Sequence, residues 1–514
     1  MTSASPGNSV VNAYARRVVE SSLVRYGALA LLFLVQPVRE AMRVSAFSNT
    51  DVWLHIRSGL WMLQQHAVPR NGIFSQLPGG MWIASNWLYE AGLGAAYQFF
   101  GIRSIPIILM GLQLVFAVLV FLLARGGRDW FWRPALLCAA AQFVIGDLQP
   151  VPRTVSILFF AVELLILLHS RRSQRSMPLF LLPVLFLVWA NADEQFLLGL
   201  GILGLYIATL WTERVASRLS PKAEAVDTTF FARALFAGGA AFLATLLTPY
   251  SYRLYADAFR SAYNPVLYQY FDLMQALPFR KLQHTAFLFL VMAAFFVLGR
   301  AAKRDHFKLA ILTASACLSF RFQRDGWCVA LIAVAILGDS LAEKLPKLRV
   351  ERNRRAWPAI AALTCVLIAV FAVATTRIPS NTELTRRARN FMPFEAADYI
   401  RQHHLPGPLF NSYGWGGFLA FNLPEYPVVI DSRMELYGDE YSLQYFRIVE
   451  GKQRLETFPN FVGAQTIILE RSSGIAEALT TLPALQAQFR VVYQDRQAVV
   501  LVRNQAQPEQ PSLQ

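Results

Sequence analysis

Residues 285–308 read TAFLFLVMAAFFVLGRAAKRDHFK, an apolar run followed directly by a basic cluster. The same alternation recurs along the chain: basic clusters are separated by apolar sequence long enough to cross a bilayer out and back, at about 20 residues per crossing. The clusters lie at residues 16–25, 125–133, 171–175, 214–233, 300–308 and 344–355. Because Arg and Lys accumulate in cytoplasmic loops, we expect all of these clusters to face the cytoplasm. The alternation predicts an α-helical polytopic membrane protein.

The composition agrees with this class. Of the 514 residues, 55% are hydrophobic and 16% are charged, which is too apolar for a soluble protein of this size. The net charge of +15 lies in short loops rather than on one face, so membrane orientation explains it better than nucleic-acid binding. The four cysteines lie inside apolar stretches and have no metal-type spacing. The first apolar run lacks a cleavage site and is expected to be retained.

The basic clusters divide the chain into about eleven predicted spans, with residues 1–22 in the cytoplasm and the C-terminus outside. The predicted transmembrane domain covers residues 23–377 and includes an outer loop at 48–102. The predicted spans are 23–47, 106–124, 134–151, 154–169, 178–192, 196–211, 232–249, 285–298, 309–320, 327–341 and 357–376. Residues 87–100 are apolar but short and contain Glu90, so we expect them to lie flat on the outer surface.

From Ile378 the chain becomes mixed in polarity. Strand-like runs at 428–430, 466–469, 491–493 and 499–502 alternate with helix-like stretches at 393–404, 440–451 and 474–489. This rhythm predicts a small extracytoplasmic α/β domain over residues 378–503. A polar tail at 504–514 is expected to be disordered.

The polar residues suited to chemistry lie in the predicted outward connections. The candidates are Asp51, His55, Asp147, Arg153, Asp193, Glu194, Arg253 and Arg324. A helical bundle gathers such loop ends around one opening, as ligand sites between helices require. We therefore predict a site on the outer face.

Asp51 follows the first span and precedes Trp53 and His55. A carboxylate at this boundary can take a proton from an acceptor hydroxyl, or hold a cation beside a lipid-linked phosphate. The alternative is structural: Asp51 caps a helix over residues 52–64, and the tryptophans form an interfacial belt.

Further candidates lie at the other outward turns. Arg153 and Arg324 can bind a donor phosphate through the guanidinium fork, and Arg253 is a third substrate-binding candidate. Asp147 is a second catalytic candidate, because ionisable residues at this depth are costly unless paired or facing a cavity. Asp193 and Glu194 can bind substrate or a divalent cation such as Mg²⁺ or Mn²⁺. An Asp147–Arg153 ion pair and a solvated turn at Asp193 are the structural alternatives.

The first outer loop carries a recognisable pattern. Asp51-x-Trp53-x-His55, Pro69-Arg70, Phe74-Ser75, Trp82 and Trp87-Leu88-x-Glu90 resemble the corresponding loop of bacterial GT-C membrane glycosyltransferases. These include enzymes of the protein O-mannosyltransferase, aminoarabinose transferase and oligosaccharyltransferase types. Further likenesses lie at residues 189–199, 247–250, 411–419 and 429–433. The resemblance implies a catalytic role for Asp51 and a polyprenyl phosphate or diphosphate sugar donor.

The sequence departs from that pattern at three places. Asp193-Glu194-Gln195 stands where many relatives have His-Gly-Gly, Asn71 where many have Asp, and Thr248 where many have Asn. The glycine-rich stretch at 414–417 does not have nucleotide-binding spacing. It is similar to an acceptor-binding loop, which would involve Trp415, Gly416 and Asp431; a tight turn in the α/β domain is the alternative.

Three functional classes remain open. An enzyme would transfer a sugar to a glycan, lipid or protein acceptor at the outer face of a bacterial inner membrane. A non-catalytic scaffold would dock partners through the C-terminal domain. A transporter or flippase would show internal repeats and mid-span polar sites, which the sequence does not display.

Overall fold

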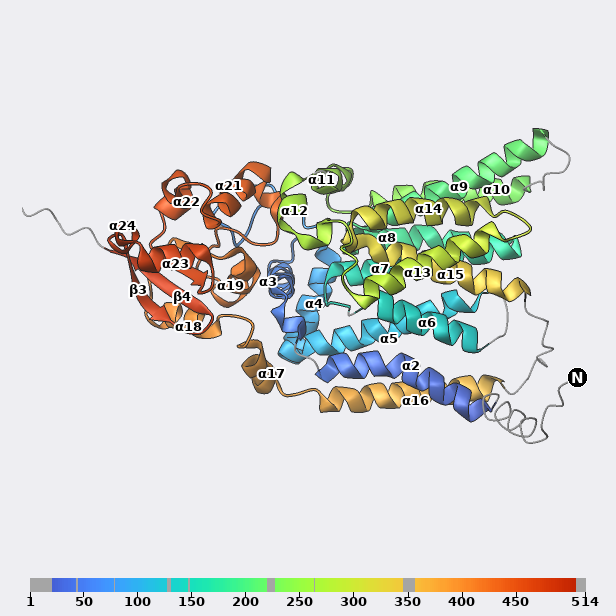
Figure 1. Ribbon diagram of the computed structural model, residues 1–514, viewed down its shortest axis with the longest axis horizontal. Coiled ribbons are helices and arrows are strands. Elements are labelled where there is room, and N and C mark those ends of the chain that lie inside the picture. Colours follow the sequence, from blue (N-terminus) through green and yellow to red (C-terminus); the bar gives the residue numbers. More distant parts are fainter. Residues whose placement is uncertain are drawn as a thin grey trace, which may run out of the picture. The chain divides into compact units, whose positions relative to one another are not determined.

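The structure is a computed structural model that describes residues 21–42, 45–77, 79–126, 131–146, 148–219, 227–262, 264–344 and 356–504. The chain forms two compact units, which are described separately below (Figure 1). Unit 1 comprises Met1–Arg43, Ile105–Thr248 and Phe271–Ile378. Unit 2 comprises Val44–Ser104, Pro249–Tyr270 and Pro379–Gln514, so the predicted first outer loop groups with the C-terminal region.

Unit 1 is helical, and each predicted span corresponds to a helix. These helices are α2 (Ser22–Met42), α5 (Ser104–Arg125), α6 (Trp132–Ile145), α7 (Pro152–Ser173), α8 (Leu182–Ala192), α9 (Phe196–Leu219), α10 (Thr228–Thr245), α13 (Leu282–Gly299), α14 (His306–Arg321), α15 (Gly326–Lys344) and α16 (Ala356–Arg377). The 3-10 turns η3 (Met177–Leu181), η4 (Asp272–Met274) and η5 (Gln323–Asp325) connect them.

Five segments of the described residues are long and apolar enough to cross a membrane. They are Trp87–Arg125, Pro152–Ser173, Phe196–Leu219, Thr228–Thr245 and Leu282–Gly299. Shorter apolar helices lie at Trp132–Ile145, Met177–Ala192 and Leu367–Arg377. The chain is therefore a multi-pass membrane protein, whereas the count of about eleven spans and their orientation remain predictions.

The first of these segments is interrupted. Helix α4 (Trp87–Phe100) ends at Gly101, whose φ of +61° suits glycine, and the 3-10 turn η2 (Gly101–Arg103) precedes α5. Residues 87–100 thus form a helix of their own, and their position relative to the bilayer stays a prediction.

Helix α15 is the central helix of unit 1. It contacts α6, α7, α13 and α14, and the last two run beside it in Figure 1. Each residue from Val329 to Ala335 is at most 1% exposed. A helix that is apolar all round is expected to be enclosed on every side, and the neighbours of α15 enclose it.

One end of unit 1 carries an ion-pair network. Its members come from the ends of α7, α9, α14 and α15 and the residue before α14: Arg171, Arg172, Glu213, Asp305, Lys308 and Asp339. Arg171 lies 2.6 Å from Glu213, and Arg172 lies 2.6 Å from Asp339. The structure thus brings members of separate basic clusters to the same end of the bundle, as the predicted alternation requires.

Unit 2 contains a four-stranded sheet in the order β1-β2-β4-β3. The strands are β1 (Leu409–Asn411), β2 (Thr466–Glu470), β3 (Phe489–Gln494) and β4 (Ala498–Arg503). Strand β1 runs parallel to β2, whereas β4 pairs antiparallel with both β2 and β3. Three of the predicted strands are therefore present, in a small mixed sheet.

The predicted strand at 428–430 is wrong. This segment is buried and makes only an isolated bridge, from Val428 to Ser75, among the described residues. The Asn411 side chain forms hydrogen bonds with the backbone of this segment. Val429 N–H donates to Asn411 Oδ1 at 2.8 Å, and Asn411 Nδ2 donates to Ile430 O at 2.9 Å. A side-chain amide thus replaces a strand ladder, and the edge position belongs to β1 instead.

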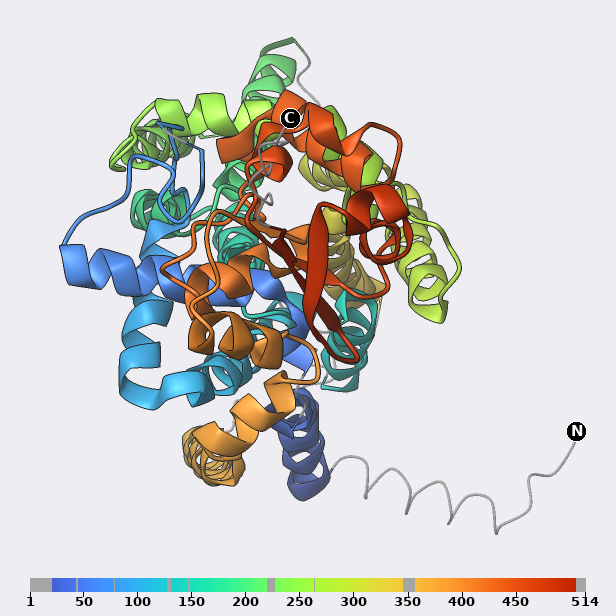
Figure 2. The same ribbon diagram turned by 90° about the vertical axis from the view of Figure 1, so that its left-hand side faces the viewer.

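Helices surround the sheet of unit 2, as Figure 2 shows for its red and orange elements. The helices of this unit are α3 (Thr50–Gln65), α4, α11 (Arg253–Ala262), α12 (Pro265–Tyr270), α17 (Asn381–Ala388), α18 (Phe394–Gln402), α19 (Gly416–Asn422), α20 (Met434–Tyr437), α21 (Asp439–Val449), α22 (Pro459–Val462), α23 (Gly474–Thr481) and α24 (Pro483–Gln486). The predicted helix at 474–489 is interrupted before Pro483, as expected of proline.

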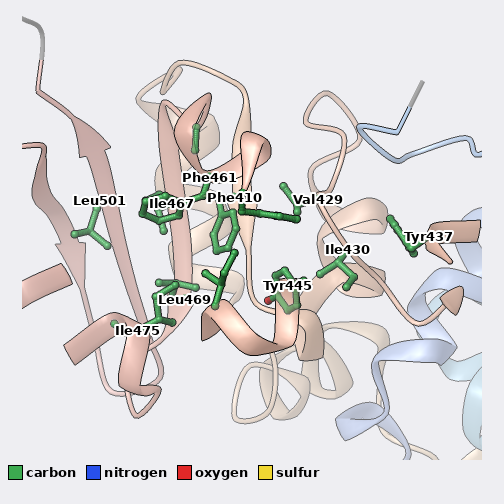
Figure 3. Packing of buried hydrophobic residues seen from close by; sticks show 14 of the residues in the cluster. Phe410, Val429, Ile430, Tyr437, Tyr445, Phe461, Ile467, Leu469, Ile475 and Leu501 are labelled. Carbon is green, nitrogen blue, oxygen red and sulfur yellow. The ribbon is translucent and has the colours of Figure 1, made fainter. Parts of the chain in front are cut away.

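The core of unit 2 is aromatic and aliphatic (Figure 3). Phe410 of β1 packs against Tyr445 of α21 and Phe461 of α22, with ring centroids 5.8 and 5.3 Å apart. Ile467 and Leu501 cover the same cluster from β2 and β4. This core fixes β1 and the residues that follow it, which belong to the candidate site.

Candidate active site

Asp51 lies in the first turn of α3 but is not its cap. The side chain of Asn49 caps the helix, accepting a hydrogen bond from the Asp51 backbone N–H at 3.0 Å. The structural alternative for Asp51, a helix cap, is therefore wrong. Its half-buried carboxylate lies at the helix N-terminus, where the macrodipole stabilises negative charge.

Asp51 belongs to an acidic cluster in unit 2 that also contains Asp431 and Glu435. These three carboxylates lie close enough to Tyr413 to act on its phenol. Burial raises the pKa of Tyr413 well above its usual value, and the negative charges of Asp51, Asp431 and Glu435 raise it further. The phenol therefore stays protonated at neutral pH and is available as a hydrogen-bond donor beside the carboxylates.

His55 lies one helical turn after Asp51 and forms a hydrogen bond with Glu90 of α4. The distance from His55 Nδ1 to Glu90 Oε1 is 2.8 Å. Both side chains are largely buried, so this contact ties α3 to α4. The predicted substrate-binding role of His55 remains a prediction, and Glu90 is a partner to which the sequence assigned no role.

The glycine-rich stretch at 414–417 contains a 3-10 turn, η6 (Tyr413–Trp415), and then begins α19, where its glycines pack closely on other backbone. A Cβ on Gly416 would lie 2.7 Å from the Asp431 Cα, and one on Gly417 would lie 2.6 Å from the Thr50 O. Both clashes would involve backbone, so only glycine lets α19 pack directly against the start of α3. This packing brings Trp415 and Gly416 next to Asp431, as the acceptor-loop prediction groups them.

Asp431 is fully buried and holds Arg433. Arg433 Nη2 donates to Asp431 Oδ2 at 2.6 Å, and Nε donates to Asp431 Oδ1 at 3.0 Å. The guanidinium also lies over the Trp82 ring, 4.6 Å from its centroid. Burial alone would lower the pKa of Arg433, but the Asp431 charge and its hydrogen bonds raise it, so the guanidinium stays charged. Arg433 was part of the resemblance but not of the predicted site.

Unit 1 contains a pocket of about 200 Å³ that includes Arg153 and Arg324. Lys281 and His284 also line it. Its apolar wall consists of Val144, Ile145, Leu148, Ile157, Leu273, Leu277 and Phe287. The structure thus brings together two of the predicted phosphate-binding arginines and adds a lysine and a histidine. A pocket that combines cations with an apolar wall suits an anionic lipid.

Three helices begin at this pocket. Arg153 and Thr154 open α7, His284 lies in the first turn of α13, and Gly326 and Trp327 open α15. The N-terminus of a helix carries partial positive charge and backbone N–H groups without helical partners, so it favours anions. All three helix dipoles therefore add to the side-chain cations.

Among the described residues, Trp327 Nε1 and His284 Nδ1, buried atoms of two residues that line the pocket, have neither a hydrogen-bond nor an ion-pair partner. Trp327 is 5% exposed and packs edge-on against Phe160, with centroids 5.1 Å apart. A buried donor without a partner costs about 1–3 kcal/mol, which a ligand oxygen would recover. These atoms could therefore form hydrogen bonds to an anion in the pocket.

Asp193 and Glu194 lie beside Arg324. Glu194 Oε1 is 3.8 Å from Arg324 Nη1, and Asp325 Oδ1 is 3.4 Å from Arg324 Nε. Ser156 donates a short hydrogen bond to Asp193 and itself accepts one from Trp189 Nε1 at 2.6 Å. Asp193 is therefore held in a buried network, and the solvated-turn alternative for this residue is wrong.

Burial and, after it, the neighbouring charge of Glu194 together raise the pKa of Asp193 to about 7. Burial alone would lower the pKa of Arg324, but Asp325, Glu194 and Asp193 raise it, so the guanidinium stays charged. Asp193 thus titrates near neutral pH next to a permanent cation. Ser156 and Lys281 are members of this region that were not among the predicted site residues.

Two predicted residues remain apart from these groups. Arg253 begins α11 in unit 2 and is exposed, so its convergence with Arg153 and Arg324 of unit 1 stays a prediction. Asp147 lies outside the described residues. Within the described ranges, no three His, Cys, Asp or Glu side chains are grouped so that they could hold a metal ion.

No protein-family model matches the sequence, and neither does any curated protein. Solved structures do match. The oligosaccharyltransferase AglB of Archaeoglobus fulgidus, in complex with an inhibitory peptide and a dolichol-phosphate, is 12% identical over 95% of this chain and 74% of its own, with a TM-score of 0.55. The same enzyme tethered to an acceptor peptide gives 11% identity, 94% and 74% coverage and a TM-score of 0.54.

ArnT of Cupriavidus metallidurans bound to undecaprenyl phosphate matches at 14% identity over 93% of this chain and 97% of its own, with a TM-score of 0.46. At such identities, likeness to a solved structure establishes the fold alone. On the oligosaccharyltransferase matches, the chain has the fold of the archaeal enzyme AglB, which is one of the enzyme types that the sequence resembles.

Proposed function

We propose that the chain is a membrane glycosyltransferase that moves a sugar from a polyprenyl phosphate or diphosphate to an acceptor at the extracytoplasmic face. The observation that carries this proposal is the pocket of unit 1. It combines the cations Arg153, Lys281 and Arg324 with an apolar wall and two buried polar atoms without partners. A phosphate on an isoprenoid chain matches both parts of the pocket: the phosphate suits the cations, and the isoprenoid chain suits the apolar wall.

The arginines would bind and stabilise the departing phosphate. When the sugar leaves the donor, the bond between its anomeric carbon and the phosphate oxygen breaks, and negative charge develops on that oxygen. Guanidinium groups and helix N-termini arranged in advance stabilise such charge without reorganisation. His284 and Trp327 would add hydrogen bonds to the same group.

Asp51 would act on the acceptor. As the bond between the acceptor and the anomeric carbon forms, the acceptor loses a proton, and the Asp51 carboxylate would take it. Tyr413 would position the acceptor or Asp51 by donating a hydrogen bond from its protonated phenol. These roles need no metal ion, and the proposal assigns none.

The fold supports the donor class. The archaeal oligosaccharyltransferase with which this chain shares its fold binds a dolichol-phosphate and an acceptor peptide. The resemblance in the first outer loop assigns the catalytic role to the position of Asp51.

The donor half of the proposal can be tested with undecaprenyl phosphate as a probe and the alcohol undecaprenol as its matched control. Both share the apolar chain, so an anion site should bind the phosphate at least about tenfold more tightly, since hydrogen bonds to charged groups contribute about 1.5–3 kcal/mol each. Native mass spectrometry of the purified protein measures this ratio. Equal binding of the two probes would reject the pocket as a phosphate site.

A further inference from the structure

A second groove, of about 310 Å³, lies at the other end of unit 1 between the ends of α5 and α7. Four leucines line it, Leu122, Leu123, Leu165 and Leu168, together with the cationic or titratable side chains of Arg125, His169 and Arg172. Leu122 is 42% exposed, so its apolar side chain continues onto the surface of α5. The groove therefore joins an apolar strip to a basic rim.

The floor of this groove is rigid. Gly126 adopts a φ of +60°, and a Cβ there would lie 2.8 Å from the Gly338 O of α15. A Cβ on Gly338 would in turn lie 2.9 Å from the Ala124 carbonyl carbon. The end of α5 thus packs directly on the α15 backbone, and Asp339 fixes Arg172 at 2.6 Å. The groove exists before any ligand binds.

Positive charge is in excess around it. Arg172 and Lys308 both contact Asp339, and Arg133 also feels its charge. Among the described residues of this end, the cations Arg125, Arg133, Arg171, Arg172 and Lys308 outnumber the acids Glu213, Asp305 and Asp339. An anion entering the groove would meet Arg125, His169 and Arg172.

We propose that this groove binds the phosphate head group of an anionic phospholipid. The phosphate would lie between Arg125, His169 and Arg172, and an acyl chain would follow Leu122 and Leu165 along the bundle. Basic pockets between transmembrane helices recognise anionic lipids in this way, and guanidinium–phosphate pairs are among the stronger hydrogen bonds in proteins. The site is independent of the proposed donor pocket, with which it shares no residue.

The test uses the full-length protein in phosphatidylcholine nanodiscs that contain a minor fraction of phosphatidylglycerol, and native mass spectrometry counts the retained lipid. In Arg125→Gln/Arg172→Gln, phosphatidylglycerol affinity should fall about tenfold or more, because each basic residue near a membrane contributes about a factor of five. The charge-matched control is Arg214→Gln/Arg218→Gln, on α9 and outside the groove; it should retain the lipid. Leu165→Trp keeps every charge but fills the groove, and it should also lose the lipid.

Four results would overturn the proposal. The control pair could lose as much lipid as the groove pair, which would indicate general surface attraction. Leu165→Trp could bind phosphatidylglycerol normally, so that the groove is not the site. The wild type could show no preference for phosphatidylglycerol over phosphatidylcholine. Soluble glycerol phosphate could displace the lipid at equal concentration, which would identify a free-phosphate site.

Discussion

Gly59 of α3 and Gly94 of α4 lie backbone against backbone where the two helices cross. A Cβ on Gly94 would come 2.6 Å from the Gly59 carbonyl carbon, and one on Gly59 would clash with the Glu90 carbonyl. One turn before each glycine stand His55 and Glu90, whose side chains meet at 2.8 Å. The close crossing is what lets these two side chains reach each other.

The first prediction follows from this crossing. Gly94→Ala should lower the apparent melting temperature, because overpacking of a tight contact costs about 1–3 kcal/mol. Gly92→Ala is the matched control on the same helix: a Cβ there meets nothing within 4 Å, so the helix propensity of alanine should stabilise it by up to about 1 kcal/mol. Thermal unfolding of the detergent-solubilised variants measures both. Opposite signs are expected, and a stabilised Gly94→Ala would mean that the helices do not cross this closely.

The second prediction separates the helix cap from the catalytic candidate. Asp51→Asn leaves Asn49 in place as the cap, so folding should be unaffected, whereas turnover should fall by about 10²–10⁴ if Asp51 takes the acceptor proton. Asn49→Ala should do the reverse, costing about 1 kcal/mol of stability while retaining turnover. Sugar transfer and thermal unfolding are measured on both variants.

Normal turnover in Asp51→Asn would remove Asp51 from the mechanism. Attention would then move to Asp431 and Glu435, the other carboxylates near Tyr413. Absence of transfer by the wild type with any lipid-linked sugar would favour the scaffold alternative.

The sequence predicted the helical bundle well, because membrane spans are set by composition and length and need no tertiary information. It also placed Arg153, Asp193, Glu194 and Arg324 at one face, and the structure brings Arg153 and Arg324 into one pocket, with Asp193 and Glu194 beside Arg324. Long-range contacts were missed. The Asn411 amide replaces the hydrogen bonds of a strand ladder at 428–430. It joins residues that are distant in sequence, so no local pattern predicts it.

The same limit explains the errors at the candidate site. Asp51 and Asn49 are both good cap residues, so sequence alone could not choose between them. For the glycines at 416 and 417 the sequence offered an acceptor-binding loop or a turn but not close packing, because close backbone packing has no local signature. Lys281 and Trp327 were not assigned to the site because their relevance depends on three helices starting at one pocket.

The third prediction concerns the donor pocket. Arg153→Lys and Arg324→Lys keep the charge but lose the planar fork, so undecaprenyl phosphate affinity should fall about tenfold or more in each. Arg321→Lys is the control, since Arg321 is exposed on the neighbouring turn and lies over Phe322 instead of lining the pocket. Binding is measured by native mass spectrometry. If both pocket variants bind undecaprenyl phosphate as tightly as the wild type, Arg153 and Arg324 do not bind the phosphate and their role is structural.

The fourth prediction concerns orientation. If the basic clusters face the cytoplasm, a cysteine at the exposed Ser173 should resist an impermeant thiol reagent in intact cells. A cysteine at the exposed Ala484 of unit 2 should react, because the C-terminal domain is predicted to be extracytoplasmic. Permeabilised cells provide the control, in which both positions should be labelled. Labelling of Ser173→Cys in intact cells would reverse the predicted orientation.

The fifth prediction uses the titration of Asp193, whose pKa burial raises from 3.8 to about 7. Between these two values the folded state keeps a proton that the unfolded state releases, so stability should fall as the pH rises through this window. Above about pH 7 both states are ionised, and the loss is complete. Asp193→Asn has no such group and can still accept the Ser156 hydrogen bond, so its stability relative to the wild type should rise between about pH 4 and 7 and then level off.

A second variant checks the cause of that window. The hydrogen bond from Ser156 lowers the pKa of Asp193, so Ser156→Ala should move the upper end of the window to higher pH. Thermal unfolding of the wild type and both variants across this pH range measures the three curves. Parallel curves for the wild type and Asp193→Asn would show that Asp193 is already ionised when folded. Arg324 would then be compensated by a full charge at Asp193 throughout the physiological range, and the pocket would show no pH dependence from this residue.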